Sequence, residues 1–292
     1  MRSHRRAAFT LPEILVVMTI MAVLGIGFVK LVVAQLQFSQ HEFGKKSARA
    51  VARSAMNLLV ADLRMVQDSG GVDSVSSDRR TVRVYVPYAF GLVCSATAGT
   101  MIASLLPVDS TAVSLAKYGG YAWRDSTKRW RIVTPTNPGA ADSVKTYATP
   151  ATCTGVAAGQ AGLRTMSLNG RTGRVISVTP GATGVGKRTP IYLWQKITYS
   201  FAASTAFPGL YGLYRTPSGG ASEEIMAPFD STSAFQFYVP SKDNSKTTIP
   251  ALSQIRGFDV VLSGASAKLV PGQPRVLVQM VTGVFFKNTR SF

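Results

Sequence analysis

The sequence predicts an α+β protein in which one long N-terminal helix is followed by a head of antiparallel strands. Two observations support this prediction. Apolar residues run almost without interruption to about Ala34, and they then recur at helical spacing as far as Val66. After Gly71 apolar and polar residues alternate, and linkers rich in Gly, Pro, Ser and Thr separate the alternating segments. This change of period places the boundary between the helix and the head at about residue 70.

The helix is expected from Phe9 to about residue 70, with a first half that is apolar on every side and a second half that is amphipathic. The apolar stripe of the second half comprises Ala48, Val51, Ala52, Ala55, Leu58, Leu59, Leu63 and Val66. The predicted solvent side holds Lys45, Lys46, Arg49, Arg53, Asp62 and Arg64. We expect the face bearing Ala48, Val51, Ala55 and Leu59 to pack on the later strands.

The head is expected to occupy residues 71–292 and to be rich in strands. Strands are predicted at 81–88, 120–124, 129–133, 174–178, 190–202, 209–215, 223–228, 234–239, 255–263 and 275–287. Trp123 and Trp130 are expected to pair across a hairpin whose turn is Asp125–Lys128. The segment from about 94 to 168 is low in charge and shows little periodicity, so it is predicted to be an irregular insertion.

Composition limits the possible functions. A hydrophobic content of 46% is enough for a packed core and is not that of a disordered chain. The formal net charge of +18 is spread along the chain, which favours attraction to an anionic envelope surface over sequence-specific binding of nucleic acid.

The residues needed for catalysis or for metal binding are scarce. The two histidines are His4 and His41, which are too near the N-terminus to form a Ser-His-Asp triad or a paired-histidine metal site in the head. The acidic residues Glu223, Glu224, Asp230, Asp243 and Asp259 match no calcium loop. We therefore expect no catalytic residue, no metal and no cofactor.

One segment, Gly181–Thr189, nearly matches the phosphate-binding loop of nucleotide-binding proteins. Gly181, Gly186 and Lys187 have the required spacing, but Arg188 stands where a hydroxyl should bind Mg²⁺. A strand, rather than the helix that such a loop requires, is predicted to follow. A glycine-rich turn between two strands is the better interpretation.

The N-terminus contains the most specific motif. Arg5 and Arg6 lead to Ala8, and the apolar segment that follows holds one acid, Glu13, whose burial in a membrane costs several kcal/mol unless it is paired. A cut before Phe9 would create an amino group within one helical turn of Glu13. The run Phe9-Thr10-Leu11-Pro12-Glu13 after a basic leader resembles the N-terminus of type IV prepilins and pseudopilins. Ala8 departs from the family's usual Gly, and Pro12 is tolerated in a first helical turn.

This resemblance implies how the chain is processed and located. A prepilin peptidase would remove the leader, residues 1–8, by cutting between Ala8 and Phe9, and the same enzyme family would methylate the new amine of Phe9. Glu13 would then guide assembly with other pilin or pseudopilin subunits at an inner-membrane assembly platform. Three arginines before the apolar run place the N-terminus in the cytoplasm, with the head periplasmic or extracellular. The rival interpretation is an ordinary secretory signal or an uncleaved anchor, although no Ala-x-Ala-like site follows Phe28.

The C-terminal end carries a second resemblance. The apolar segments 255–262 and 276–288 look similar to the last two strands of J-type pseudopilins of type II secretion and of PilW-like minor pilins. Together the two resemblances imply a minor pseudopilin or pilin, placed at the tip of a type II secretion pseudopilus or a type IV pilus. The alternatives are a competence-type minor pilin that binds DNA and an uncleaved, membrane-anchored envelope protein.

Cys94 and Cys153 are the two cysteines of the chain, and both lie in the part predicted to be exported. An isolated pair in an oxidising compartment usually forms a disulfide, which we expect here. Two buried free thiols are the alternative.

Overall fold

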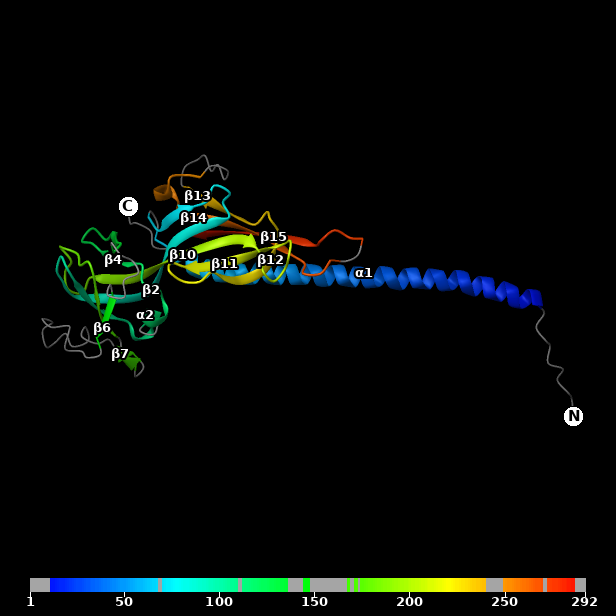
Figure 1. Ribbon diagram of the computed structural model, residues 1–292, viewed down its shortest axis with the longest axis horizontal. Coiled ribbons are helices and arrows are strands. Elements are labelled where there is room, and N and C mark those ends of the chain that lie inside the picture. The colour runs from blue at the N-terminus through cyan, green and yellow to red at the C-terminus, as the bar shows by residue number, and fades with distance from the viewer. Residues whose placement is uncertain are drawn as a thin grey trace.

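The computed structural model describes residues 11–67, 70–109, 112–135, 144–147, 167–168, 171–172, 174–239, 249–269 and 272–286. One long helix, α1 (Leu11–Leu63), packs its second half against a large antiparallel sheet, while its first half projects from the head as a rod (Figure 1). The predicted α+β architecture is therefore confirmed.

The head contains two further short helical elements, η1 (Pro107–Asp109) and α2 (Ala112–Leu115), and a turn, η4 (Leu252–Gln254). Its strands are β1 (Val72–Val75), β2 (Thr81–Ala96), β3 (Met101–Leu105), β4 (Gly120–Arg124), β5 (Trp130–Val133), β6 (Val144–Tyr147), β7 (Ser167–Leu168), β8 (Arg171–Thr172), β9 (Val175–Val178), β10 (Pro190–Ala203), β11 (Tyr211–Pro217), β12 (Glu223–Phe229), β13 (Ala234–Tyr238), β14 (Gly257–Ala265) and β15 (Leu277–Phe285). The main sheet has the order β13-β14-β12-β11-β10-β2-β3-β9-β6, with β1, β4, β5 and β15 joined beside it.

Two long strands, β2 and β10, form the centre of the sheet and divide the head into two lobes (Figure 1). We call the lobe packed on α1 the proximal lobe and the lobe beyond the end of α1 the distal lobe. The proximal core is formed by α1 with strands β2 and β10–β15, and the distal core is formed by the other ends of β2 and β10 with β3, β4 and β9.

A bulge at the boundary explains how one strand serves both cores. In the pairing of β2 with β10, Ala89 lies opposite Leu193 but Pro87 lies opposite Trp194, which leaves Tyr88 as an extra residue. The side-chain alternation of β2 therefore changes phase. Val84 and other even positions belong to the proximal core, and Ala89 and other odd positions belong to the distal core.

Most predicted strands are present, but the structure corrects three expectations. The helix ends at Leu63 rather than near residue 70, because Val66 and Gln67 turn inward and are buried in the head. The strand predicted at 81–88 continues to Ala96, since the bulge at Tyr88 interrupts the alternation that the prediction relied on.

The third correction concerns the segment 94–168, which was predicted to be irregular. Among its described residues, β4 and β5 match the strands predicted at 120–124 and 129–133, whereas β3 and β6 are strands that were not predicted. All four join the main sheet. Four of the five residues of β3 are buried, so apolar and polar residues do not alternate along it. A prediction based on alternation therefore misses this strand.

The hairpin of β4 and β5 is confirmed, but its predicted tryptophan pair is wrong. Asp125 bonds Arg129 across the turn, with Lys128 at a φ of 61°, and this turn sets the register. Trp123 is consequently opposite Arg131, and Trp130 is opposite Arg124. The two indoles pack in different clusters, Trp130 against Tyr192 with a centroid separation of 4.6 Å.

Candidate functional site

The first turn of α1 holds the acidic residue that the sequence singles out. Glu13 is exposed there, next to Pro12, whose missing N–H would have no partner at this position in any case. No ion pair in the described part of the chain involves Glu13. Ala8 and Phe9 lie outside the described residues, so cleavage between them and pairing of Glu13 with a new amino group stay predictions.

The first half of α1 exposes large apolar side chains on all sides. They include Leu11, Leu15, Met18, Val23, Leu24, Phe28, Leu31, Leu36 and Phe38. Among the described residues, α1 is the one helix long and apolar enough to cross a membrane, and its apolar stretch is not buried by the rest of the chain. This surface needs a lipid or protein environment that a single chain in water does not supply.

The second half of α1 presents a narrow row of small and apolar residues to the sheet. The buried positions are Ala48, Ala52, Ala55, Leu59 and Leu63. Close approach depends on Gly264 of β14, since a Cβ at this position would lie 2.3 Å from the backbone oxygen of Ala48. The predicted packing face is therefore confirmed for Ala48, Ala55 and Leu59, whereas Val51 is half-buried at its margin.

Asp62 was expected on the solvent side, but it forms a polar anchor between the helix and the sheet. Its Oδ2 accepts a hydrogen bond from the Tyr199 hydroxyl and lies 3.6 Å from Nε of Arg215. Burial and the neighbouring Asp62 charge raise the pKa of Tyr199, so the phenol stays protonated as a donor. The sequence could not reveal this role, because the partners of Asp62 lie more than 130 residues away.

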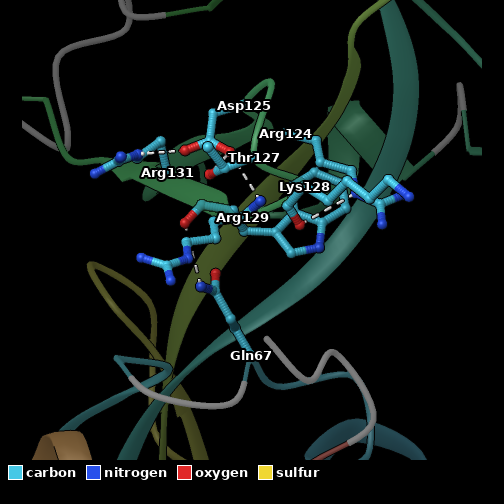
Figure 2. Close-up of polar contacts among 8 residues, drawn as sticks. Gln67, Arg124, Asp125, Thr127, Lys128, Arg129 and Arg131 are labelled. Carbon is cyan, nitrogen blue, oxygen red and sulfur yellow. Dashed lines mark hydrogen bonds and ion pairs between the residues drawn. The ribbon is translucent and has the colours of Figure 1, made fainter. Parts of the chain in front are cut away.

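The turn between β4 and β5 is rich in basic side chains (Figure 2). It exposes Arg124, Lys128, Arg129 and Arg131 around a single acid, Asp125. Hydrogen bonds from the Thr127 hydroxyl (2.6 Å) and the Arg129 amide (2.9 Å), then Arg131, lower the pKa of Asp125 to about 2. The ionised carboxylate therefore holds the turn and balances one of its four cations.

Gln67 connects this basic hairpin to the end of the helix segment, as Figure 2 shows. Its Nε2 donates to the backbone oxygen of Trp130 (3.5 Å), and its Oε1 accepts from the Tyr192 hydroxyl (2.7 Å). The side chain is almost completely buried, so both groups are paired away from water. The distal lobe is thereby held to the chain segment that leaves α1.

A cleft of about 530 Å³ lies where the head first meets the helix. Gln40, Phe43, Gly44 and Ser47 line it on α1, and residues 266–269, which follow β14, line it on the head. Gly44 allows this contact, since a Cβ there would approach the Ser266 side chain to 3.2 Å. The sequence offered only a weak signal for this junction, namely a glycine within a helical pattern.

The remaining candidate residues are structural or fall outside the described chain. The segment Gly181–Thr189 leads directly into strand β10, as expected, and not into the helix of a phosphate-binding loop. Cys94 is buried in β2, whereas Cys153 is outside the described residues, so their pairing stays a prediction. No group of three or more His, Cys, Asp or Glu side chains gathers in the described part of the chain.

Glu224 has a role in the fold that the sequence did not indicate. Burial raises its pKa, but hydrogen bonds from Ser204 and Thr205 outweigh that effect, so the net pKa lies below its ordinary value. The charged carboxylate caps the start of the turn between β10 and β11.

Comparison with known proteins identifies the N-terminal segment. Residues 3–29 match the prokaryotic N-terminal methylation motif. No curated protein and no solved structure gives a significant match to the chain. The motif includes the basic leader, Ala8, Phe9 and Glu13, and it continues into the exposed apolar half of α1. The chain therefore carries an N-terminal methylation motif of the kind found in prepilins and pseudopilins, on a long helix packed against an antiparallel sheet.

Proposed function

We propose that this protein is a minor subunit of a type II secretion pseudopilus or a type IV pilus. It waits in the inner membrane as a single-pass protein and then enters the filament through α1. The observation that carries the proposal is the exposed apolar half of α1, which no other described residue covers. A helix of this length can cross a bilayer, and several such helices can also bury one another along a filament axis.

The size of the head favours a minor subunit over a major subunit that repeats along the filament. With the proximal lobe alone, the subunit would have one compact domain packed beside its helix. The distal lobe adds a second part of the head, which extends beyond the end of α1 (Figure 1). A bulky second lobe is harder to repeat along a filament than to place once at its tip. We therefore propose a tip position, with the head contacting other minor subunits.

Glu13 is proposed to act during assembly. Cleavage by a prepilin peptidase between Ala8 and Phe9 would create the amine that pairs with Glu13, in the same subunit or in a neighbour. In an apolar filament core such a pair specifies axial register more than it adds stability. The inner-membrane assembly platform would be where this register is set.

The first test is the mature N-terminus. Mass spectrometry of the native protein should find a chain beginning with N-methylated Phe9. A retained leader, or cleavage after Phe28, would contradict the proposal and would favour an uncleaved or conventionally secreted envelope protein.

The second test separates assembly from insertion. Glu13→Val should leave membrane insertion and cleavage intact but greatly reduce recovery of the subunit in purified filaments. Glu42→Val is the matched control, because it makes the same change in α1 at a residue outside the apolar half, where Glu42 pairs with Lys45 at 3.1 Å. Equal recovery of the two variants in filaments would show that Glu13 has no role in setting the axial register.

A competence-type pilin that binds DNA is the second candidate, and the basic turn between β4 and β5 favours it. The four cations there match what contact with a phosphate backbone requires. Binding of the full-length protein to duplex DNA should then fall steeply with salt and weaken in Arg124→Gln/Lys128→Gln. Absence of salt-sensitive binding would contradict DNA binding and leave the secretion and pilus functions. The genomic neighbourhood would then distinguish these two, since a secretin gene with other pseudopilin genes indicates type II secretion and a retraction ATPase gene with a major pilin gene indicates a type IV pilus.

A further inference from the structure

The position of the membrane along α1 can be read from its charges. The uncharged apolar segment begins after Glu13 and reaches Ala34, interrupted by Lys30, and Gln35 begins a more polar stretch. About 20 residues of helix cross the roughly 30 Å hydrocarbon core, so this segment fits one span. Lys30 lies one turn from its outer end, where a long side chain can reach the interface.

The same scale places the head relative to the lipid headgroups. The headgroup layer adds roughly 5–8 Å on each side of the hydrocarbon, or about five helical residues. The helix therefore leaves the headgroups near Gln40, which is the first residue of α1 to line the cleft with residues 266–269. In Figure 1 the β14–β15 hairpin is the part of the head that reaches furthest along α1 toward the N-terminus.

The side chains at this height combine positive charge with exposed apolar groups. Lys46 is exposed on α1, Lys268 is exposed in the loop, and Phe43 and Leu269 expose 68% and 57% of their surface. Helical side chains lean toward the N-terminus, which here is the direction of the membrane. Cations with interspersed apolar groups next to a spanning helix are the chemistry that binds anionic lipid headgroups.

The loop is held in shape by hydrogen bonds of its own, so its outward side chains are positioned before any contact. Arg275 donates through Nη1 to the backbone oxygens of Ser266 and Ala267, and the Ser266 hydroxyl donates to the backbone oxygen of Lys268 at 3.0 Å. The side chains of Lys268 and Leu269 are exposed beside these bonds.

We propose that residues 266–269, with Lys46, rest on anionic phospholipid headgroups while the subunit waits in the membrane. The inference rests on the proposed membrane-anchored state of α1. The contact would hold the head upright beside its helix, and it would have to break when the subunit is pulled into a filament. A lipid surface is favoured over a protein partner because any bilayer spanned by α1 must lie at this height.

The test uses the full-length chain reconstituted in vesicles, with the photo-cross-linking residue benzoylphenylalanine at position 269. The vesicles contain phosphatidylcholine alone or phosphatidylcholine mixed with anionic phosphatidylglycerol. We expect lipid adducts at position 269 in the mixed vesicles, and fewer in the neutral ones. The matched control places the same residue at Ser126, in the basic but distal β4–β5 turn, where lipid adducts should be rare.

Charge variants then test the role of the cations. Lys46→Gln with Lys268→Gln should lower the adduct yield at position 269 by about fivefold for each charge removed. Lys128→Gln with Arg129→Gln removes the same charge from the distal turn and should leave the yield at 269 unchanged. The proposal is overturned if adducts at 269 and 126 are equally frequent, if neutral lipid serves as well, or if 269 cross-links to protein instead. None of these results bears on N-terminal processing or on filament entry, which test the proposed function separately.

Discussion

The two lobes of the head share two strands but build their cores differently. The proximal core closes around the second half of α1, with Leu59 and Leu63 completely buried among strand residues. The distal core contains no residue of α1 and consists of strand and loop side chains on the far ends of β2 and β10. All four buried polar side-chain atoms that lack a hydrogen bond in the described chain belong to residues in or beside the distal lobe, namely Tyr88, Ser104, Tyr118 and Trp194.

The two cores differ in how directly a force on α1 reaches them. A pull on α1 reaches the proximal core directly through packed side chains and through Asp62 with its sheet partners. The distal lobe receives that pull indirectly, through shared strands and the contacts of Gln67. The proximal lobe is thus the part suited to hold the subunit in an assembly, and the distal lobe is the part free to carry a specific contact.

The largest expected effect tests the dependence of the proximal core on α1. Leu59→Ala should lower the free energy of unfolding of the head by about 2–5 kcal/mol, because it leaves a cavity where helix and sheet meet. Chemical denaturation in detergent, followed by circular dichroism and by hydrogen exchange in β14 of the proximal lobe, would measure this. Leu24→Ala is the matched control in the exposed half of α1, and an equal loss in both variants would show that the helix does not support the head as described.

A second substitution tests the distal core by itself. At Gly120 a Cβ would lie 2.4 Å from both the Trp194 ring and the backbone oxygen of Val133, and the φ of +156° strains any other residue. Gly120→Ala should therefore cost about 1–3 kcal/mol through overpacking. Hydrogen exchange should show the loss in β4 and β5 with little change in β14. A uniform loss through both lobes would mean that they unfold as one unit.

The same contrast governs how much could be predicted from the sequence. The helix, its packing face and the regular strands of the proximal lobe follow from the spacing of apolar residues, as the row from Ala48 to Leu59 shows. In the distal lobe such predictions fail at two places. The bulge at Tyr88 shifts the alternation of β2, and β3 has no alternation because four of its five residues are buried. Contacts such as Asp62 with Arg215 join distant segments, so no local pattern could indicate them.

For the candidate site, the sequence identified a motif but could not show its surroundings. Glu13 and the residues before it were found because the motif fixes residue types at successive positions. The cleft at Gly44 depends on where the loop after β14 meets α1, which is decided by the register of the whole sheet. Nothing in residues 266–269 alone indicates that they lie beside the helix.

A third prediction concerns alkaline pH. Burial, then the Asp62 charge, raises the pKa of Tyr199 above the unfolded value of about 10. Its contribution to stability is therefore complete below pH 10 and is lost as the pH rises further. Tyr199→Phe should cost about 1–2 kcal/mol at neutral pH, because Asp62 loses a hydrogen bond. In this variant the proximal lobe should also lose less stability above pH 10 than it does in the wild type. An unchanged dependence of stability on alkaline pH would show that Tyr199 is not the group responsible.

The smallest expected effect compares two exposed turns, one in each lobe. Asp125 in the distal turn and Asp78 in the proximal turn both have a lowered pKa, chiefly through hydrogen bonds from the hydroxyls of Thr127 and Ser76 respectively. A lowered pKa gives stability that is present above pH 4 and fades as the pH falls toward about 2 for Asp125. Since both carboxylates lie in turns at the surface of the head, the effect should be local rather than global.

Asp125→Ala should speed amide exchange at Arg129, whose N–H donates to that carboxylate at 2.9 Å, and should remove the acid sensitivity of the β4–β5 turn. Asp78→Ala should do the same at Arg80, whose N–H donates to Asp78 at 3.1 Å, without affecting the distal turn. The distal turn should also respond more strongly to salt than the proximal turn, because Arg131 pairs with Asp125 at 2.9 Å while exposing 61% of its side chain. If salt changed exchange equally in the two turns, the ion pair would have no part in shaping the basic hairpin, and its cations would be arranged by the backbone alone.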